Sequence, residues 1–393
     1  MSAKVKPRIA LVVSHPIQHF CPQYASFAEH PDIEFKVFFA SSLGLDKYID
    51  PNFKMEISWK NMPIDSFEHE FVNGRTPLPS GADLDAPQIE QSLEAFKPDI
   101  VIIYGYFQKL SRRVHRWASC HNVKIGYISD SELRQKTRSW IKPIKKIWLR
   151  YYFSKIDYFL TVGDANEEYY RSLGAKQHQL VRMHFPIDQK LYDASYLNRQ
   201  VLRAQVRQKH GIAEDAIVTC VVGKLVTWKN QDHLVDALRL LEIKNRKLEL
   251  LLVGSGELED VILEKSNSLK INRVHHVGFV NTDVLPGYYA AADMYSHPAS
   301  REPHSIAISE AIAMGNPIIC SDTCGSHGPS DDVQTTNGLI YPFGNIHSLT
   351  DCFSTLMGST KMRQEFGLKS RHLSESFQHC AHKNIIDSLI SKL

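Results

Sequence analysis

Residues 217–241 read IVTCVVGKLVTWKNQDHLVDALRLL: a β-branched run, a short loop and a helical pattern. The run Ile217–Val222 predicts a strand. After the loop, apolar residues recur on one helical face, at Leu234, Ala237, Leu238 and Leu241. A strand, a loop and a helix in this order form the repeating unit of a parallel α/β sheet.

The same alternation runs from one end of the chain to the other. Runs that are apolar on both faces, such as Ile100–Ile103 and Leu250–Val253, suit strands covered by helices on both sides. We therefore expect an α/β protein with two doubly wound, Rossmann-like domains, since domains usually hold about 100–200 residues. The expected strands are 8–13, 34–39, 99–104, 123–128, 158–162, 217–222, 248–253, 274–279, 294–296 and 317–321, and the expected helices include 19–28, 107–120 and 166–173.

The break between the halves is expected at residues 183–188, before a polar, helix-prone stretch at 193–211. This predicts a first domain of residues 1–187 and a second domain of residues 188–372. Residues 373–393 read as one helix with apolar positions at Ile385, Ile386, Leu389 and Ile390. This terminal helix is a candidate to cross back to the first domain.

Charge and cysteine content narrow the functional class. The 46 Lys and Arg residues against 43 Asp and Glu give a formal charge of +3, whereas nucleic-acid binders usually carry a clear basic excess. No apolar stretch reaches the ~20 residues that cross a bilayer, and Ile9–Val13 is too short for a signal peptide. The 7 cysteines are odd in number and mostly far apart, which favours a reducing cytoplasm.

Two lysines flank the turn after the strand Ile217–Val222. Gly223 and Lys224 end the strand, and Lys229 precedes Asn230, the expected N-cap of the next helix. Backbone N–H groups and the helix dipole favour an anion at such a turn. Two cations here would neutralise a diphosphate without a metal ion; the alternative is a pair of solvated surface lysines.

Residues 300–315, SREPHSIAISEAIAMG, carry two glutamates eight positions apart. Pro303 predicts that Glu302 is extended, and a helix is expected from Ser305, its N-cap, to Met314, with a glycine as stop signal. This element would hold a sugar through Glu302, a diphosphate through the helix start and a ribose through Glu310. The alternative is one exposed glutamate and one on a helix surface, although Glu310 stands in an otherwise small and apolar helix.

Together these motifs resemble the donor-binding half of the GT-B glycosyltransferases, specifically retaining family 4. The resemblance rests on Glu302-Pro303 through Glu310 to Pro317, with Gly223, Lys224 and Lys229 upstream, and on residues 251–256, 277–280 and 337–339. It covers the chain from about Ile217 to Phe343 and is much weaker across the first domain. It implies two Rossmann-like domains facing a cleft, with the terminal helix packing on the first domain.

The resemblance also implies roles for individual residues. Glu302 would contact the hexose of a nucleotide-sugar, Glu310 the ribose, and Lys224 and Lys229 the diphosphate. The family commonly has Phe-Gly after Glu-Pro, where this chain has His304 and Ser305, a change that affects how sugar hydroxyls are contacted. The expected donor-binding residues are Gly223, Lys224, Lys229, Phe279, Val280, Glu302, His304, Ser305, Ile306 and Glu310, with Phe279 and Val280 near the base.

Acceptor binding is expected in the first domain. The loop after the first strand lacks the glycines that many relatives have, so His15, Gln18 and His19 are expected to bind the acceptor, together with Tyr106; alternatively, the two histidines only cap and pack. After the strand 123–128, Asp130 is the candidate to face the anomeric carbon, with Ser129 as the alternative. The expected catalytic residues are Glu302, Asp130 and Lys229, in a front-face mechanism in which the donor phosphate takes the acceptor proton.

A further acidic motif, Asp83-Leu84-Asp85, matches the Asp-x-Asp pattern of metal-dependent glycosyltransferases of the other major fold. It lies in a polar segment before a helix and not at the end of a strand, so we interpret it as helix capping. We expect no metal ion and no cofactor.

Residues 134–155 form a basic strip that contains eight Lys or Arg and no acid, interleaved with aromatic and aliphatic side chains. This pattern is typical of segments that lie on anionic lipid; the alternative is a solvated face whose aromatics belong to the core. The expected localisation is cytoplasmic, peripheral at the inner membrane face.

The sequence thus predicts an enzyme that moves a hexose-type sugar from a UDP- or GDP-sugar to a glycan or lipid-linked acceptor, with retention of configuration. Two alternatives stay open: a sugar-nucleotide epimerase of the same fold, and a non-catalytic glycan- or nucleotide-binding protein. The base, the sugar and the acceptor are not determined by the sequence.

Overall fold

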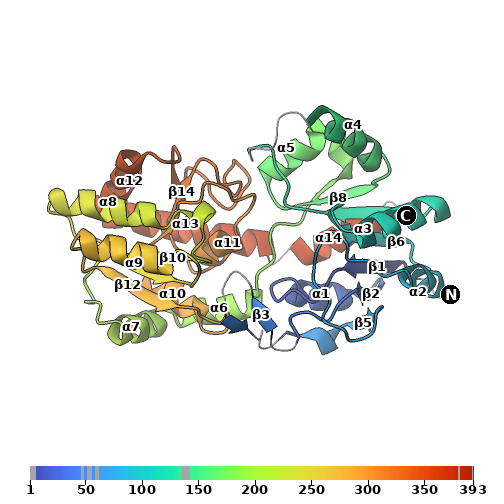
Figure 1. Cartoon of the computed structure of the whole chain (residues 1–393), viewed down its shortest axis with the longest axis horizontal. Coiled ribbons are helices and arrows are strands. Elements are labelled where there is room, and N and C mark those ends of the chain that lie inside the picture. Colours follow the sequence, from blue (N-terminus) through green and yellow to red (C-terminus); the bar gives the residue numbers. More distant parts are fainter. Residues whose placement is uncertain are drawn as a thin grey trace.

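The computed structural model describes residues 6–45, 48–50, 55–57, 62–134, 142–378, 381–391 and 393. These residues form two α/β domains side by side along the long axis of the molecule (Figure 1). Each domain contains a sheet of parallel strands, as the alternating pattern predicts.

The first domain is built on a sheet in the order β5-β2-β1-β6-β7-β8-β9. Helices cover both of its faces, which is why the runs of its central strands are apolar on both sides. Its strands are β1 (Arg8–Val13), β2 (Glu34–Phe39), β5 (Glu68–Phe71), β6 (Ile100–Tyr104), β7 (Lys124–Ile128), β8 (Tyr158–Thr161) and β9 (Leu180–Arg182), and a small antiparallel pair, β3 (Tyr48–Asp50) and β4 (Met55–Ile57), stands apart. Its helices are α1 (Cys21–Ala28), α2 (Ile89–Phe96), α3 (Lys109–His121), α4 (Lys142–Phe153) and α5 (Asp164–Ser172).

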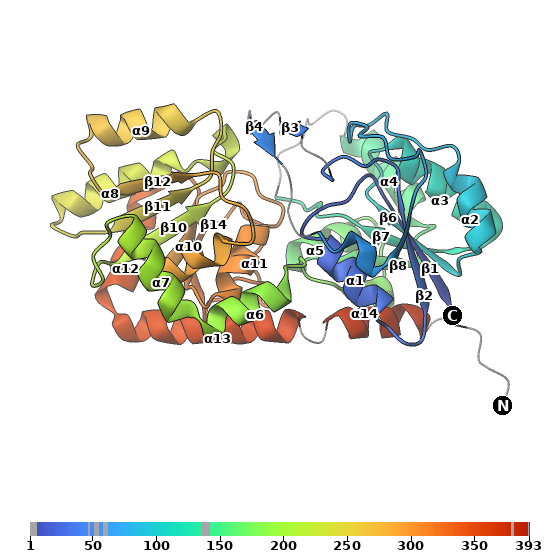
Figure 2. The same ribbon diagram turned by 90° about the horizontal axis from the view of Figure 1, so that it is seen from below.

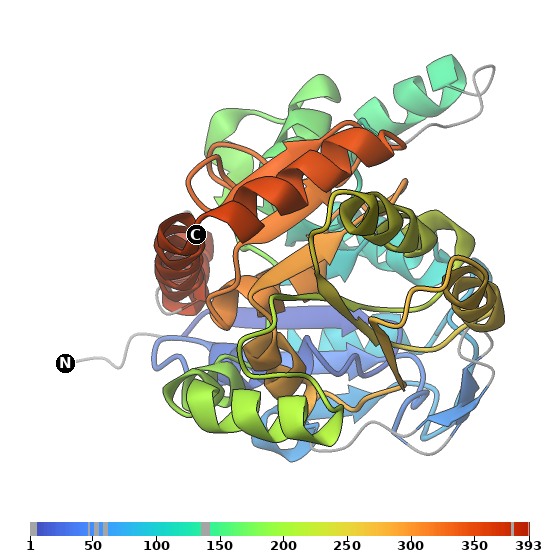
Figure 3. The same cartoon turned by 90° about the vertical axis from the view of Figure 1, so that its left-hand side faces the viewer.

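The second domain repeats the plan with the order β12-β11-β10-β13-β14-β15. Figure 3 shows it end-on, with helices on both faces of the sheet. Its strands are β10 (Val218–Val222), β11 (Glu249–Val253), β12 (Val274–Gly278), β13 (Met294–His297), β14 (Ile318–Ser321) and β15 (Gly338–Tyr341). Its helices are α6 (Gln189–Leu197), α7 (Arg199–Lys209), α8 (Asp232–Ile243), α9 (Glu259–Ser268), α10 (Leu285–Ala291), α11 (Ile306–Ala313), α12 (Ile346–Gly358) and α13 (Thr360–Gln378).

The strand order reverses once in each sheet, between β1 and β6 and between β10 and β13. In open parallel sheets, ligands bind outside the carboxyl ends of the strands at such a reversal. The residues that follow β10 and β13 are therefore placed to form a binding site.

The C-terminal segment corrects one prediction and confirms another. It is not one helix from residue 373: α13 begins at Thr360 and lies along the second domain, and α14 (Ala381–Ile390) follows it. Figure 2 shows α14 beside α1. Ile385, Ile386 and Leu389 are buried in the same core as Tyr24 and Phe27, so the terminal helix does pack on the first domain.

The chain passes between the two cores in the linker after β9. Phe185 packs against the core of the first domain, and Ile187 is buried in the core of the second. Among the described residues, no helix is long and apolar enough to cross a membrane.

Candidate functional site: a cleft between the domains

A cavity of about 350 Å³ lies between the domains at the carboxyl ends of the second sheet. Gln18 and His19 line it from the first domain, and Phe185 lines it from the linker. The second domain contributes Val222, Gly223, Lys229, Val253, Gly254, Phe279, Val280, Thr282, Leu285, Glu302, His304, Ser305, Ile306, Ala307 and Glu310. The cavity therefore includes the reversal point between β10 and β13.

Two glycines allow the ends of β10 and β11 to approach each other under this cavity. Gly223 and Gly254 have φ of +145° and +138°, which other residues rarely adopt. A Cβ at Gly254 would lie 1.9 Å from the carbonyl oxygen of Gly223. Gly254 therefore cannot carry a side chain where the two strand ends meet, and backbone, not side chain, borders this part of the site.

Glu302 is the most strongly held acid of the cavity. Its Oε2 accepts a hydrogen bond from Nε2 of His297 at 3.1 Å and pairs with Nζ of Lys229. Burial alone would raise the pKa of Glu302, but the hydrogen bond from His297 and the charge of Lys229 outweigh it and lower the pKa to about 2. Glu302 is therefore an anion at neutral pH and a strong acceptor for hydroxyl groups.

Helix α11 points its N-terminus at the cavity. It begins after Ser305 and ends before Gly315, whose φ is +69°, so the helix predicted from the sequence is confirmed. The backbone N–H of Ser305 donates to Oγ of Ser326 at 2.7 Å. Ser305, Ile306 and Ala307 line the cavity, where the first turn and the helix dipole favour an anion.

Glu310 lies one turn further along α11 and is 8% exposed. Its Oε2 accepts a hydrogen bond of 2.7 Å from the hydroxyl of Tyr289. Burial raises the pKa of Glu310 to about 7, although that hydrogen bond opposes the rise. Its carboxyl group therefore exists in both protonation states near neutral pH.

His304 closes the side of the cavity next to the linker. Its buried ring lies parallel to that of Phe185, with centroids 5.3 Å apart. Its Nε2 pairs with Oδ2 of Asp332 at 3.3 Å. Burial would lower the pKa of His304, but the interaction with Asp332 prevails and raises it, so the carboxylate of Asp332 favours the protonated ring.

Most of the predicted donor-binding residues come together in this cavity: Gly223, Lys229, Phe279, Val280, Glu302, His304, Ser305, Ile306 and Glu310 line it, as do the predicted acceptor-binding residues Gln18 and His19. Lys224 does not line it. Lys224 is half-buried in the loop after β10, and its carbonyl accepts a hydrogen bond from Gln231. Asn230 is not an N-cap: it has φ of +51° ahead of α8 and accepts the N–H of Ser300.

The remaining first-domain candidates lie around the cavity or away from it. Nδ1 of His15 is 2.9 Å from Oγ of Ser14. Burial lowers the pKa of both His15 and His19 to about 4, so both are neutral at pH 7. Tyr106 packs edge-on against Trp148 of α4 and does not line the cavity.

Asp130 is exposed two residues after the end of β7, and it does not line the cavity. Desolvation in the cleft raises the pKa of Asp130; the charge of Glu302 adds to the rise, and those of His304 and Arg301 oppose it. The pKa of Asp130 therefore depends on charged groups of the second domain. By contrast, Ser129 is 3.0 Å from the hydroxyl of Tyr170, within the first domain.

Sequence reasoning missed Phe185, Thr282 and Asp332. The amide of Gln18 donates to the hydroxyl of Thr282 across the cleft, and the other two residues hold His304. No local pattern marks them, since each acts through a partner more than twenty residues away.

The motif Asp83-Leu84-Asp85 is not a helix cap, because α2 begins only at Ile89. Asp83 pairs with Lys109 at 2.8 Å, and Asp85 pairs with Arg113 at 2.7 Å. Both acids thus hold α3 against the loop before α2.

The basic strip is described at Arg134 and from Lys142 onward, and its residues 135–141 lie outside the described part of the chain. On α4 one face is buried, with Leu149, Tyr152 and Phe153 in the core. The opposite face exposes Ile144, Ile147 and Tyr151, each by at least 70%. We call this face the α4 patch: Ile144, Lys145, Lys146, Ile147, Trp148, Arg150 and Tyr151, all of which are exposed.

The sequence of the second domain is similar to a known protein family. Residues 203–373 match the sequence model of the family described as glycosyl transferases group 1. An uncharacterized glycosyltransferase of Methanocaldococcus jannaschii is 33% identical over 121 residues, which are 30% of this chain and 30% of that protein. A GDP-mannose-dependent phosphatidylinositol monomannoside mannosyltransferase of Mycolicibacterium smegmatis is 24% identical over 180 residues, 43% of this chain and 46% of that protein. The chain thus matches these two relatives over less than half of their length.

Solved structures resemble the whole chain. HepE of Anabaena in complex with UDP has a TM-score of 0.72 and 17% identity, covering 98% of this chain and all of that one. A glycosyltransferase of Rickettsia africae has a TM-score of 0.71 and 14% identity, covering 98% of this chain and 97% of that one. At these identities the likeness shows the fold. The chain therefore has the GT-B fold, and residues 203–373 of its second domain are similar to the glycosyl transferases group 1 family.

Proposed function

We propose that this protein is a retaining glycosyltransferase that moves a hexose-type sugar from a nucleoside-diphosphate sugar to a glycan or lipid-linked acceptor, without a metal ion. One observation carries the proposal: Lys229, Glu302 and the start of α11 line one cavity at the strand-order reversal. A cation and a helix N-terminus suit a diphosphate, and an ionised carboxylate suits the hydroxyls of a sugar.

The donor would lie along α11. Lys229 and the first turn of the helix would hold the diphosphate, and Glu302 would accept hydrogen bonds from the sugar hydroxyls. Glu310 would accept those of the ribose, and Phe279 and Val280 would border the base. Lys224 would add positive charge from the loop below.

Catalysis would depend on position and charge. Glu302 is held by Lys229 and His297, so it would fix the sugar with little reorganisation when the donor binds. Asp130 faces these charges from the first domain and would stabilise positive charge that develops at the anomeric carbon. Because the phosphate of the donor would take the acceptor proton, no protein base is required.

The acceptor would enter from the first domain, past Gln18 and His19. We place the acceptor at a membrane surface because the α4 patch combines exposed apolar side chains with the exposed basic side chains of Lys145, Lys146 and Arg150. A cytoplasmic protein with this patch would bind the inner membrane face peripherally. A lipid-linked acceptor would then be presented close to the cleft.

A two-step experiment tests the function. Thermal unfolding with UDP, GDP and ADP should identify one nucleoside diphosphate that raises the Tm, because a ligand that binds the folded state stabilises it. Labelled sugars on that nucleotide should then be transferred to glycan or lipid acceptors, and NMR of the product should show a retained anomeric configuration. Glu302→Gln should abolish transfer while the protein stays folded.

The outcomes separate the alternatives. Conversion of the donor sugar with no acceptor present would indicate an epimerase. Binding of a nucleoside diphosphate without turnover of any donor would indicate a binding protein. Undiminished transfer by Glu302→Gln would show that the assigned donor site is wrong.

A further inference from the structure

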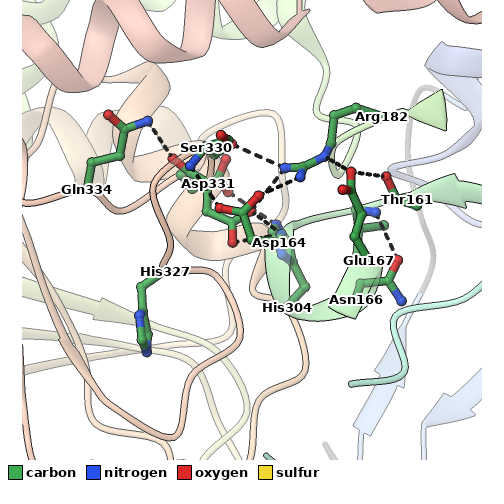
Figure 4. Close-up of polar contacts among 12 residues, drawn as sticks. Thr161, Asp164, Asn166, Glu167, Arg182, His304, His327, Ser330, Asp331 and Gln334 are labelled. Carbon is green, nitrogen blue, oxygen red and sulfur yellow. Dashed lines mark hydrogen bonds and ion pairs between the residues drawn. The ribbon is translucent and has the colours of Figure 1, made fainter. Parts of the chain in front are cut away.

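A cluster of charged side chains joins the two domains beside the cleft (Figure 4). We call it the latch: Asp164, Glu167 and Arg182 from the first domain, and Ser330 and Asp331 from the second. Arg182 is the last residue of β9. Its Nη2 pairs with Asp164 at 2.6 Å, and its Nε pairs with Glu167 at 2.8 Å. Its Nη1 crosses the domain boundary to Oδ1 of Asp331 at 3.4 Å and to the carbonyl of Ser330 at 3.2 Å.

The contact between Asp164 and the loop of the second domain is reciprocal. Both carboxylate oxygens of Asp331 accept the backbone N–H of Asp164, at 3.1 and 3.0 Å. A residue of the second domain thus gives a hydrogen-bond partner to the first N–H group of α5, in the first domain. In return, Oδ2 of Asp164 accepts the N–H of Ser330 at 2.8 Å. Each domain thus supplies both a donor and an acceptor.

Two glycines make this fit possible. A Cβ at Gly163 would lie 2.5 Å from Oδ1 of Asp331, and one at Gly328 would lie 2.4 Å from Oδ2 of Asp164. The side chain of Asp331 is fully buried. Burial raises the pKa of Asp331 to about 7, and an isolated carboxylate is costly in such a place, so its ionised form depends on the partners across the boundary.

Both sides of the latch lead directly to His304. Three residues after Arg182 the linker places Phe185 parallel to the ring of His304, with centroids 5.3 Å apart. One residue after Asp331, the carboxylate of Asp332 pairs with Nε2 of His304 at 3.3 Å and accepts a 2.5 Å hydrogen bond from Ser309. His304 lines the candidate donor cavity. It is therefore held between two residues whose chain neighbours form the latch.

We propose that the pairing of Arg182 with Asp331 positions His304 and Phe185 for donor binding by holding the two domains together. These are positioning residues, which act on the donor through His304. Their effect on the donor depends on the proposed function, but their effect on domain arrangement does not. Gln18–Thr282 and the bond from Arg134 to the carbonyl of Cys324 also join the domains, so loss of the latch should weaken closure without separating the domains.

The test compares Arg182→Gln, Asp331→Asn and the double variant with wild type. Arg171→Gln is the matched control, because Arg171 pairs with Glu167 at 2.7 Å in the same cluster, but both Glu167 and its other partner, Gln177, lie in the first domain. Each single latch variant should lower the affinity for the stabilising nucleoside diphosphate by about 10-fold, a typical coupling between distant groups. Small-angle scattering should give a larger radius of gyration, and the control should match wild type in both.

The double variant makes the test specific. If the two residues act as one contact, it should bind the nucleotide no more weakly than the worse single variant. Affinities within twofold of wild type, or losses that add fully in the double variant, would overturn the proposal. If a glutamine variant does not fold, Arg182→Lys replaces it; it keeps the charge but loses the fork, and it should show a smaller loss in the same direction.

The two proposals can fail separately. If the wild type binds none of the nucleotides, the proposed function fails, and the scattering comparison still decides the latch. If the nucleotide binds but scattering and affinity do not respond to either variant, the latch fails and the proposed function stands.

Discussion

Nε2 of His297 and Nζ of Lys229 meet on a single carboxylate oxygen, Oε2 of Glu302. His297 is the last residue of β13, and Lys229 belongs to the turn after β10. The two strands that flank the reversal of the second sheet thus hold the same acid. In the ligand-free protein Lys229 neutralises Glu302, and an entering diphosphate would share that lysine.

Because Lys229 would be shared in this way, we expect it to contribute more than Lys224 to binding of the nucleoside diphosphate. Lys229→Gln should weaken binding of the nucleoside diphosphate by about 10–100-fold, because a hydrogen bond to a charged group contributes about 1.5–3 kcal/mol. Lys224→Gln should cost less, since Lys224 does not line the cavity. Calorimetric titration of both variants measures the difference; an equal or larger loss for Lys224→Gln would place the diphosphate nearer that residue.

Nucleotide binding should release protons near pH 7. Burial raises the pKa of Glu310 to about 7, and ribose hydroxyls that donate to the ionised carboxylate would lower it again. Titration in two buffers of different ionisation enthalpy should show release of a fraction of a proton per nucleotide. Glu310→Gln should abolish the release, and a release that persists in this variant would exclude Glu310 as its source.

The α4 patch should bind anionic lipid. Reversing the charges of Lys145, Lys146 and Arg150 should reduce cosedimentation with phosphatidylglycerol vesicles, because each basic residue near such a surface contributes about 1 kcal/mol. Reversal of Lys244, Arg246 and Lys247, which are exposed on the second domain, is the control. Binding that does not change, or falls equally in the control, would contradict the assignment.

Stability should fall on mild acidification because of buried neutral histidines. Burial lowers the pKa of His15, His19 and His184 to about 4. Between pH 6.5 and 4 these groups bind protons in the unfolded state but not in the folded state, so the free energy of unfolding decreases as the pH falls. Each should cost about 1 kcal/mol at pH 5.5.

Urea unfolding of wild type and His19→Gln at pH 7.5 and 5.5 measures this effect. The raised pKa values of Glu310 and Asp331, both about 7, act in the opposite direction, so the comparison between variants is needed. His19→Gln should lose less stability than wild type over this range. An equal loss in both proteins would contradict the prediction.

The sequence predicts the parts of the fold that local patterns encode. The helix after Ser305 and its end at Gly315 are confirmed; the stop acts locally through the positive φ of Gly315, whereas the side chain of Ser305 makes no capping hydrogen bond. The short edge strands β5 and β9 escaped prediction, since Glu68–Phe71 and Leu180–Arg182 carry little of the apolar pattern of central strands. Asn230 adopts a left-handed conformation because it binds Ser300, a contact that only the folded chain creates.

The residues of the candidate site also fall into those that local sequence indicates and those that only the folded chain brings together. Glu302 and Glu310 stand out in sequence because each breaks a local pattern. Phe185 and the latch could not be found, because their roles arise from contacts between segments that meet only when the domains come together. Asp332 could not be found because it meets His304 only when the second domain folds. Tyr106 was grouped with the acceptor residues by its place after β6, whereas its ring packs against α4.

A crystal structure of the protein with the nucleoside diphosphate that stabilises it tests the central claim most directly. The account predicts that the diphosphate lies at the start of α11 beside Lys229 and that the ribose lies at Glu310. The free end of the diphosphate should then leave room for a sugar next to Glu302. A nucleotide bound outside this cavity, or inside it with its phosphates away from Lys229 and α11, would contradict the account.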